Sequence, residues 1–253
     1  MPYFDFRNHK LFYRIQGKGS LLIVLPGNTA SSICHQPELD YFSKDFTTVS
    51  LDYLGTGKSD RLTRFSDHWY AECAEQTYDL INHLTLGPAV LLGTSGGAVV
   101  ALHTAAHFPK QVRAVIADSF TPSLTQELLQ HNVINERKKP SENQAAFWSY
   151  AHGEDWAEVV QMDTAMLVNL VQSGGEWLKD VLDRVSCPVF FTASLEDNSL
   201  VNPTAHTLAM LNQVKDGRAF FSQHGGHPLI WSAPEEFRLA IKGFLDAYRL
   251  SLK

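Results

Sequence analysis

The sequence predicts an α/β fold in which an open, mostly parallel central sheet is flanked by helices. Two observations support this prediction. Short apolar runs alternate with helical stretches along most of the chain, and the runs at 21–25 and 89–92 are apolar at every position. A strand buried on both faces of a parallel sheet has such a continuous apolar pattern, and regular alternation of strands and helices is typical of a sheet covered on both sides.

The individual elements follow in the order that this fold requires. Two short strands joined by a turn are expected first, at 3–7 and 10–16. A partly helical segment is expected before Asp45, and the main helices are expected where apolar residues recur at helical spacing. In chain order the later strands are expected at 21–25, 47–51, 89–92, 112–117, 188–193 and 218–221, and the main helices at 66–84, 98–108, 203–211 and 234–250.

Residues 121–183 interrupt the alternation. This segment is expected to be all helical, and it is rich in aromatic side chains such as Phe147, Trp148 and Trp156. We therefore expect a core made of residues 1–120 and 184–253, with 121–183 as a small helical cap over the carboxyl edge of the sheet. Either the aromatic residues form the core of this cap segment, or some of them line an apolar substrate pocket.

The composition is that of a globular protein and argues against several classes of partner. Hydrophobic residues make up 44% and charged residues 19% of the 253 positions. A net charge of -6 gives no basis for nucleic-acid binding. No apolar run approaches the ~20 residues that span a bilayer, and no signal-peptide pattern opens the chain. Three widely spaced cysteines suggest inert thiols. We expect a cytoplasmic protein with a small-molecule substrate and leave its oligomeric state open.

A candidate nucleophile lies in the run Gly93–Gly97, which reads Gly-Thr-Ser-Gly-Gly. It matches the G-x-S-x-G nucleophile elbow and stands between an apolar strand and an alanine-rich helix. The strand must turn into the helix so abruptly that only small residues fit beside the serine. The hydroxyl of Ser95 is then presented at the sheet edge, beside the positive end of the helix.

A serine hydroxyl needs a base, and His227 is the candidate. It lies in a Gly-Gly-His-Pro run between the last expected strand and the last helix, and imidazole exchanges protons near neutral pH. The base needs a carboxylate partner. Asp197, which follows the 188–193 strand, is preferred, while Asp118 and Glu196 remain open alternatives. No residue pattern implies a metal or an organic cofactor.

With these motifs in place, the chain resembles the α/β-hydrolase superfamily over essentially its whole length. The run Leu25–Asn28 looks like the oxyanion loop of the family, with Pro26 where the family usually has histidine. The run Asp52–Ser59 resembles the D-x-x-G-x-G-x-S loop, which we interpret as structural. The resemblance implies that the main-chain N–H groups of Asn28 and Gly96 form the oxyanion hole.

The leading hypothesis is a serine hydrolase, a carboxylesterase that cleaves an ester or related acyl bond of a small, mostly apolar substrate through an acyl-enzyme intermediate. A serine at position 95 separates the chain from dehalogenases and epoxide hydrolases of this fold, which have aspartate there. Small esterases of the valacyclovir-hydrolase type carry an acidic residue where this chain has Gly96, so amino-ester recognition is not expected. A C–C bond hydrolase or lyase with the same triad, and a non-catalytic ligand receptor, remain as alternatives.

Overall fold

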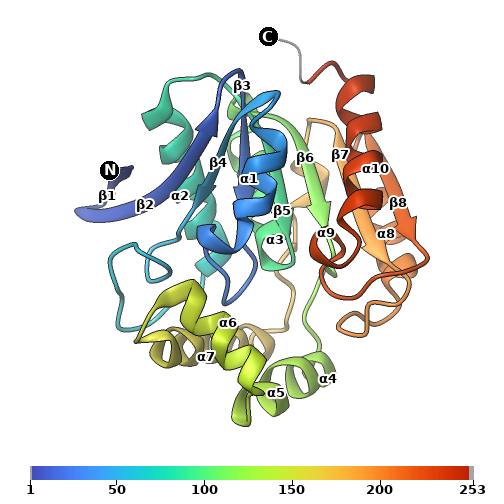
Figure 1. Cartoon of the computed structure of the whole chain (residues 1–253). Coiled ribbons are helices and arrows are strands. Elements are labelled where there is room, and N and C mark those ends of the chain that lie inside the picture. Colours follow the sequence, from blue (N-terminus) through green and yellow to red (C-terminus); the bar gives the residue numbers. More distant parts are fainter. Residues whose placement is uncertain (1, 251–253) are drawn as a thin grey trace.

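The computed structural model describes residues 2–250, and eight of their strands form one sheet (Figure 1). The sheet order is β1-β2-β4-β3-β5-β6-β7-β8, with antiparallel pairing of β1 with β2 and of β2 with β4, and parallel pairing elsewhere. The mostly parallel sheet that the sequence predicts is therefore confirmed. The strands are β1 (Tyr3–Phe6), β2 (His9–Gly17), β3 (Ser20–Leu25), β4 (Phe46–Leu51), β5 (Ala89–Thr94), β6 (Val112–Asp118), β7 (Val189–Ser194) and β8 (Gly217–Ser222).

Helices cover both faces of the sheet. Two separate hydrophobic clusters, one on each face, hold them there. One layer consists of α2 (Trp69–Leu84), α3 (Gly96–His107) and α8 (Pro203–Leu211); the other, in front of the sheet in Figure 1, consists of α1 (Gln36–Phe42), α9 (Leu229–Ser232) and α10 (Pro234–Ala247). Short 3₁₀ turns lie at Ser32–His35, Pro109–Gln111 and Leu182–Arg184.

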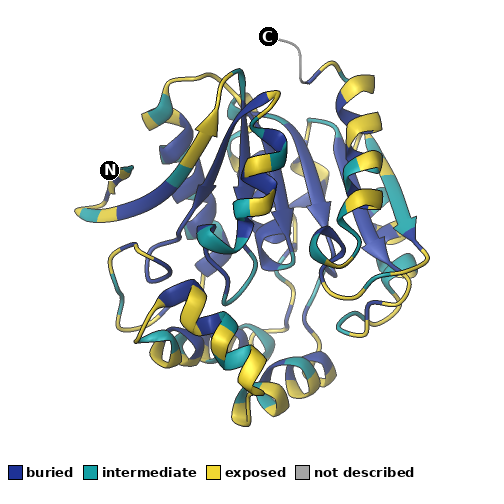
Figure 2. Ribbon diagram, in the orientation of Figure 1, coloured by how far each residue is buried: buried dark blue, intermediate teal, exposed yellow. Residues whose placement is uncertain are grey.

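Strand β3 shows why the central runs are apolar at every position. Leu21, Ile23 and Leu25 point into one cluster, while Leu22 and Val24 point into the other. All five side chains are fully buried, and the central strands are dark blue in Figure 2. Burying each such side chain stabilises the fold by roughly 1.5–3 kcal/mol. The sheet edge that carries the site is therefore a rigid platform.

The segment between β6 and β7 lies across the edge at which β5, β6 and β7 end, at the bottom of Figure 1. Its helices are α4 (Gln126–Leu128), a π-helical stretch (Leu129–Asn135), α5 (Glu136–Lys138), α6 (Glu142–His152) and α7 (Trp156–Gln172). The helical character expected for this segment is present, and the exact division of the chain at residues 120 and 184 stays a prediction. No helix within residues 2–250 is long and apolar enough to cross a membrane.

Helix ends differ most from the sequence prediction. Helix α2 begins at Trp69 rather than at Ser66, because residues 66–69 form a turn closed by a hydrogen bond from the Trp69 N–H to the Ser66 carbonyl. Helix α3 begins at Gly96, directly after Ser95, and not at residue 98. The single-turn helix α9 was not predicted, since four residues show no periodicity.

Candidate active site

Ser95 occupies the sharp turn between β5 and α3. Its φ is 53° and its ψ is -125°, a conformation that costs a non-glycine residue on the order of 1–3 kcal/mol. Tight packing maintains it: a Cβ atom on Gly93 would lie 2.1 Å from the Gly97 carbonyl oxygen, and one on Gly97 would lie 2.1 Å from that of Leu25. Both glycines are required by these close approaches, so the turn holds the serine at the carboxyl edge of the sheet.

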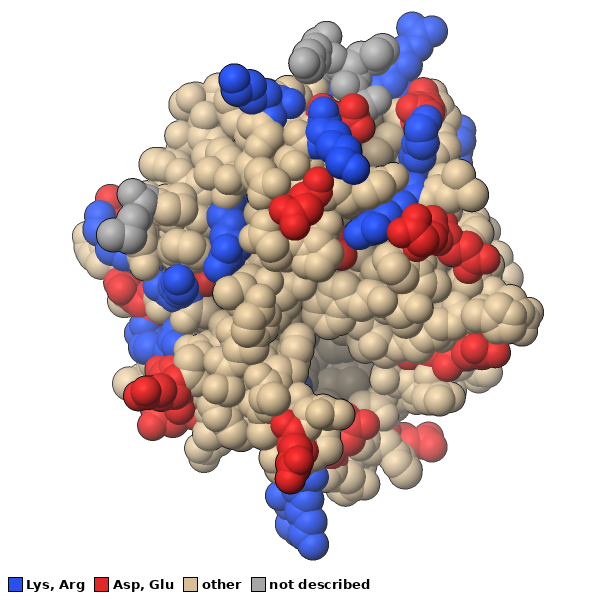
Figure 3. All heavy atoms as spheres, in the orientation of Figure 1, with Lys and Arg blue, Asp and Glu red and all other residues tan. Residues whose placement is uncertain are grey.

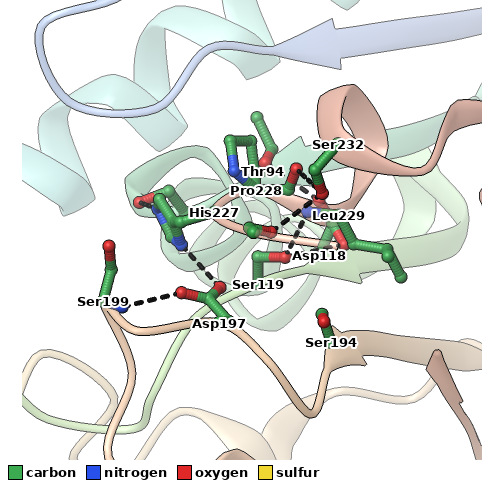
Figure 4. Close-up of polar contacts among 12 residues, drawn as sticks. Thr94, Asp118, Ser119, Ser194, Asp197, Ser199, His227, Pro228, Leu229 and Ser232 are labelled. Atoms are coloured by element: carbon green, nitrogen blue, oxygen red, sulfur yellow. Dashed lines mark hydrogen bonds and ion pairs between the residues drawn. The ribbon is translucent and has the colours of Figure 1, made fainter. Parts of the chain in front are cut away.

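Ser95, His227 and Asp197 lie in one hydrogen-bonded chain. His227 Nε2 lies 3.1 Å from Ser95 Oγ, and His227 Nδ1 lies 2.8 Å from Asp197 Oδ2. Asp197 is fully buried, and its other oxygen accepts from the Ser199 N–H at 2.9 Å (Figure 4). A carboxylate can only accept, so Nδ1 carries the proton and Nε2 faces the serine hydroxyl as an acceptor.

The two alternative carboxylates lie elsewhere. Glu196 Oε1 is 3.2 Å from His224 Nδ1, in a pair whose side chains are mostly exposed. Asp118 is buried beneath the loop that carries His227, where it accepts a hydrogen bond from Thr192 Oγ1 at 2.7 Å. Within residues 2–250 neither carboxylate forms a hydrogen bond or an ion pair with His227.

Asp118 instead fastens the segment that follows His227. Its carboxylate accepts from the Ile230 N–H at 3.2 Å. It also accepts from the Ser119 hydroxyl, which in turn accepts from the Leu229 N–H at 2.8 Å (Figure 4). Burial raises the pKa of Asp118 to about 6, against the opposing effect of hydrogen bonds led by that from Thr192. The residue thus anchors the histidine loop to the end of β6.

Asn28 and Gly96 lie side by side next to Ser95. Asn28 is in the loop after β3, and Gly96 is the first residue of α3. A Cβ atom on Gly96 would lie 3.3 Å from the Asn28 nitrogen and 1.9 Å from Asn28 Oδ1. Within residues 2–250 neither main-chain N–H has a hydrogen-bond acceptor. Two free N–H groups beside a serine can stabilise a developing oxyanion, and the helix end adds positive potential.

The side chain of Asn28 belongs to a polar chain that the sequence analysis missed. The Tyr70 hydroxyl donates to Asn28 Oδ1 at 3.1 Å, Asn28 Nδ2 donates to Asp163 Oδ2 at 2.6 Å, and Arg137 Nη1 donates to Asp163 Oδ1 at 2.7 Å. These four residues come from four separate elements and match no motif. No sequence signal could have brought them together.

A cavity of about 380 Å³ opens beside Ser95. In Figure 3 the face is hollowed between the helices at the bottom of the view and the sheet above them. Arg137 and Glu136 are the charged residues of its wall. The rest of the wall is mainly apolar and includes Phe120, Leu124, Leu128, Val133, Phe147, Trp148, Leu167, Trp177, Leu200 and Trp231. Some aromatic residues of the 121–183 segment thus line the cavity, while Trp156 stacks on Trp148.

Two histidines of α3 and the Asp52–Ser59 loop make structural contacts. His103 and His107 stack on one another along α3, and His103 Nε2 lies 2.7 Å from the Trp177 carbonyl oxygen. The Asp52 carboxylate accepts from the main-chain N–H of Lys58 at 2.7 Å, so it shapes its own glycine-containing loop. The three cysteines are free. Within residues 2–250 no cluster of three or more His, Cys, Asp or Glu is placed to hold a metal ion.

Comparison with characterised proteins places these features in a family. A family model described as "alpha/beta hydrolase fold" matches residues 20–144. The chain is 36% identical over 117 residues to 2-(acetamidomethylene)succinate hydrolase of Mesorhizobium japonicum, a match covering 46% of this chain and 41% of that protein. It is 24% identical to (E)-2-((N-methylformamido)methylene)succinate hydrolase of Acinetobacter baylyi, over 94% of this chain and 95% of that protein.

A vertebrate relative and a solved structure extend the comparison. The mouse serine hydrolase BPHL is 26% identical over 93% of this chain and 83% of its own length. The crystal structure of the enol-lactonase from Burkholderia xenovorans LB400 superposes with a TM-score of 0.77, covering 97% of this chain and all of that one, at 13% identity. That likeness is one of fold. Taken with the eight-stranded sheet and the elbow at Ser95, these matches place the chain in the α/β-hydrolase superfamily, as a hydrolase of that fold.

Proposed function

We propose that the chain is a serine hydrolase that cleaves a carboxylic ester or a related acyl bond of a small, mostly apolar substrate. The observation that carries the proposal is the hydrogen-bonded chain from Ser95 through His227 to Asp197, at the wall of an apolar cavity. The cavity volume of about 380 Å³ is at the low end of the range for ligand pockets, which supports a small substrate.

Each group has a definite role in this reaction. Ser95 Oγ attacks the carbonyl carbon while His227 Nε2 takes the hydroxyl proton, and the Asp197 carboxylate stabilises the resulting imidazolium. The N–H groups of Asn28 and Gly96 bind the carbonyl oxygen as it gains negative charge. The C–O bond to the leaving group then breaks, and the leaving alcohol takes the proton from His227. Water attacks the acyl-serine by the same steps, releasing the acid and restoring the hydroxyl.

A second candidate function is hydrolysis of an amide bond in a substrate that carries a carboxylate. Two relatives are named as hydrolases of acylaminomethylene succinates. In this chain Arg137 lies in the cavity wall, and a guanidinium is well suited to bind a carboxylate. Equal turnover of mono-4-nitrophenyl glutarate and of its neutral counterpart 4-nitrophenyl valerate would count against this candidate.

Hydrolysis of 4-nitrophenyl esters from acetate to decanoate tests the leading proposal. Activity is expected in the wild type and should be lost in Ser95→Ala. His224→Ala supplies a matched control, because His224 is an exposed histidine in the loop that also carries His227 and its imidazole does not reach Ser95. This variant should retain activity. A folded wild type that neither hydrolyses any ester nor reacts with a fluorophosphonate would overturn the proposal. Turnover of ketone or dienoate substrates alone would then indicate the C–C bond hydrolase or lyase, and ligand-induced stabilisation without product would indicate the receptor.

A further inference from the structure

Both polar atoms of the Asn28 side chain form hydrogen bonds. Its Oδ1 accepts from the Tyr70 hydroxyl and its Nδ2 donates to Asp163. The orientation of the amide follows from the chemistry, because a carboxylate binds only the NH₂ end. Burial raises the pKa of Tyr70, with the Asp163 charge adding to the effect, so the phenol stays protonated and remains a donor. Helices α2 and α7 therefore jointly fix one side chain of the loop after β3.

The side chain is packed closely where it meets its partners. The void bounded by Asn28, Tyr70, Gly96 and Asp163 among others is about 10 Å³, which holds one water molecule at most. Asn28 Oδ1 also lies against the backbone of Gly96, where an added Cβ atom would be 1.9 Å away. The position of the side-chain amide is thus coupled to both proposed oxyanion donors. One is the main-chain N–H of Asn28 itself, and the other is the main-chain N–H of Gly96, which the side chain touches.

The charge of Asp163 is balanced. Its carboxylate is almost completely buried, so an unpaired negative charge there would oppose negative charge developing on a nearby oxyanion. Arg137 Nη1 donates to Asp163 Oδ1 at 2.7 Å and to Thr164 Oγ1 at 2.9 Å. The ion pair lets the carboxylate hold Asn28 without an uncompensated charge beside the reacting atoms.

We propose that Tyr70 and Asp163 are positioning residues for the oxyanion hole, acting through the side chain of Asn28. The proposal rests on the function proposed above, in which the N–H groups of Asn28 and Gly96 stabilise the tetrahedral intermediate. A misplacement of about 1 Å at catalytic groups is sufficient to lower the rate of the chemical step by roughly 10². The alternative role for the same contacts is only to fasten α7 to the core.

Kinetics of variants distinguish these roles. Tyr70→Phe and Asp163→Asn should each lower kcat for a 4-nitrophenyl ester by roughly tenfold or more, with little change in KM. The matched control is Asp155→Asn, which breaks the Arg61–Asp155 ion pair between the 121–183 segment and the core without touching Asn28. That variant should keep kcat within about twofold of the wild type.

Two further measurements detect action through Asn28. In an Asn28→Ala background, Tyr70→Phe and Asp163→Asn should have no additional effect on kcat, because the side chain that they hold is absent. The Ki of an alkyl trifluoromethyl ketone, which forms a tetrahedral oxyanion on the serine, should rise in proportion to the loss of kcat.

The results separate the two proposals. Esterase activity of the wild type and its loss in Ser95→Ala decide the proposed function. With that activity present, unchanged kcat in Tyr70→Phe, an equal loss in Asp155→Asn, or full effects in the Asn28→Ala background would overturn the positioning role. If Asp163→Asn fails to fold by circular dichroism, Tyr70→Phe, which removes one hydroxyl only, carries the test alone.

Discussion

Replacing His152 by asparagine should remove a pH dependence of stability. His152 lies at the end of α6, where Nδ1 accepts from the Gly57 N–H at 3.0 Å and Nε2 lies 3.0 Å from the Thr29 carbonyl oxygen. The ring is therefore neutral, with its proton on Nε2. Burial lowers the pKa of His152 to about 4, with the nearby Arg61 charge adding to the effect and the hydrogen bond to Thr29 opposing it.

The sign and size of the effect follow from linkage. The folded-state pKa is depressed, so between pH 6.5 and 4 the unfolded chain binds the proton more readily and the folded state loses stability as pH falls. The depressed pKa of His152 contributes about 3 kcal/mol to the free energy of unfolding, and this contribution is fully present above about pH 6.5. The asparagine side chain would keep an acceptor for the Gly57 N–H but would not titrate. The substitution should cost about 1–2 kcal/mol at neutral pH through the lost bond to Thr29.

The assay is urea unfolding, followed by circular dichroism, of wild type and His152→Asn between about pH 4 and about pH 7.5. The difference in unfolding free energy between the two proteins should shrink or reverse as pH falls, by about 3 kcal/mol in all. His131→Asn, at an exposed histidine of the same segment, supplies the control and should show no such change. A wild-type advantage that stays constant with pH would refute the reasoning.

Three further predictions concern the site. Compared with the wild type, Asp118→Asn should be more stable at pH 7 than at pH 4, because the raised pKa of Asp118 makes wild-type stability fall as pH rises from 3.8 to about 6. A difference in unfolding free energy between the two proteins that is equal at both pH values would contradict this. Gly96→Ala should lower kcat by roughly 10² or more, because the new Cβ atom would collide with Asn28 Oδ1, and retained activity would argue against the packing described. Asp197→Asn should lower kcat by roughly 10⁴, since the amide would favour the wrong histidine tautomer, while the thermal melting temperature changes little. If Glu196→Gln lowers kcat as much as Asp197→Asn does, the choice of Asp197 as the acid is wrong.

The local sequence was informative wherever the pattern depended on neighbours along the chain. The continuous apolar run in β3 predicted a strand buried on both faces, and that burial is confirmed. The glycines around Ser95 predicted a tight turn between β5 and α3, where the structure has a positive φ. The ends of α2 and α3 were placed less well, because a cap or turn is decided by single hydrogen bonds and not by periodicity.

The acid beside His227 shows where sequence reasoning reached its limit. Asp197, Asp118 and Glu196 all follow or end parallel strands at the same sheet edge, so spacing alone left three candidates open. In the structure the loop after β7 turns Asp197 inward towards His227 and leaves Glu196 exposed beside His224. The direction in which each carboxylate points depends on how that loop packs, and its own residues do not encode this.

Sequence by itself thus determined the sheet, the elbow and the candidate serine and histidine, because these follow from hydrophobic periodicity and from the steric needs of one turn. Only the tertiary structure decided which carboxylate meets His227, which aromatic side chains line the cavity, and how Tyr70, Asn28, Asp163 and Arg137 form one polar chain. Those contacts join residues up to 135 positions apart. They exist only once helices from distant parts of the chain are packed around the same loop, and no local pattern specifies that packing.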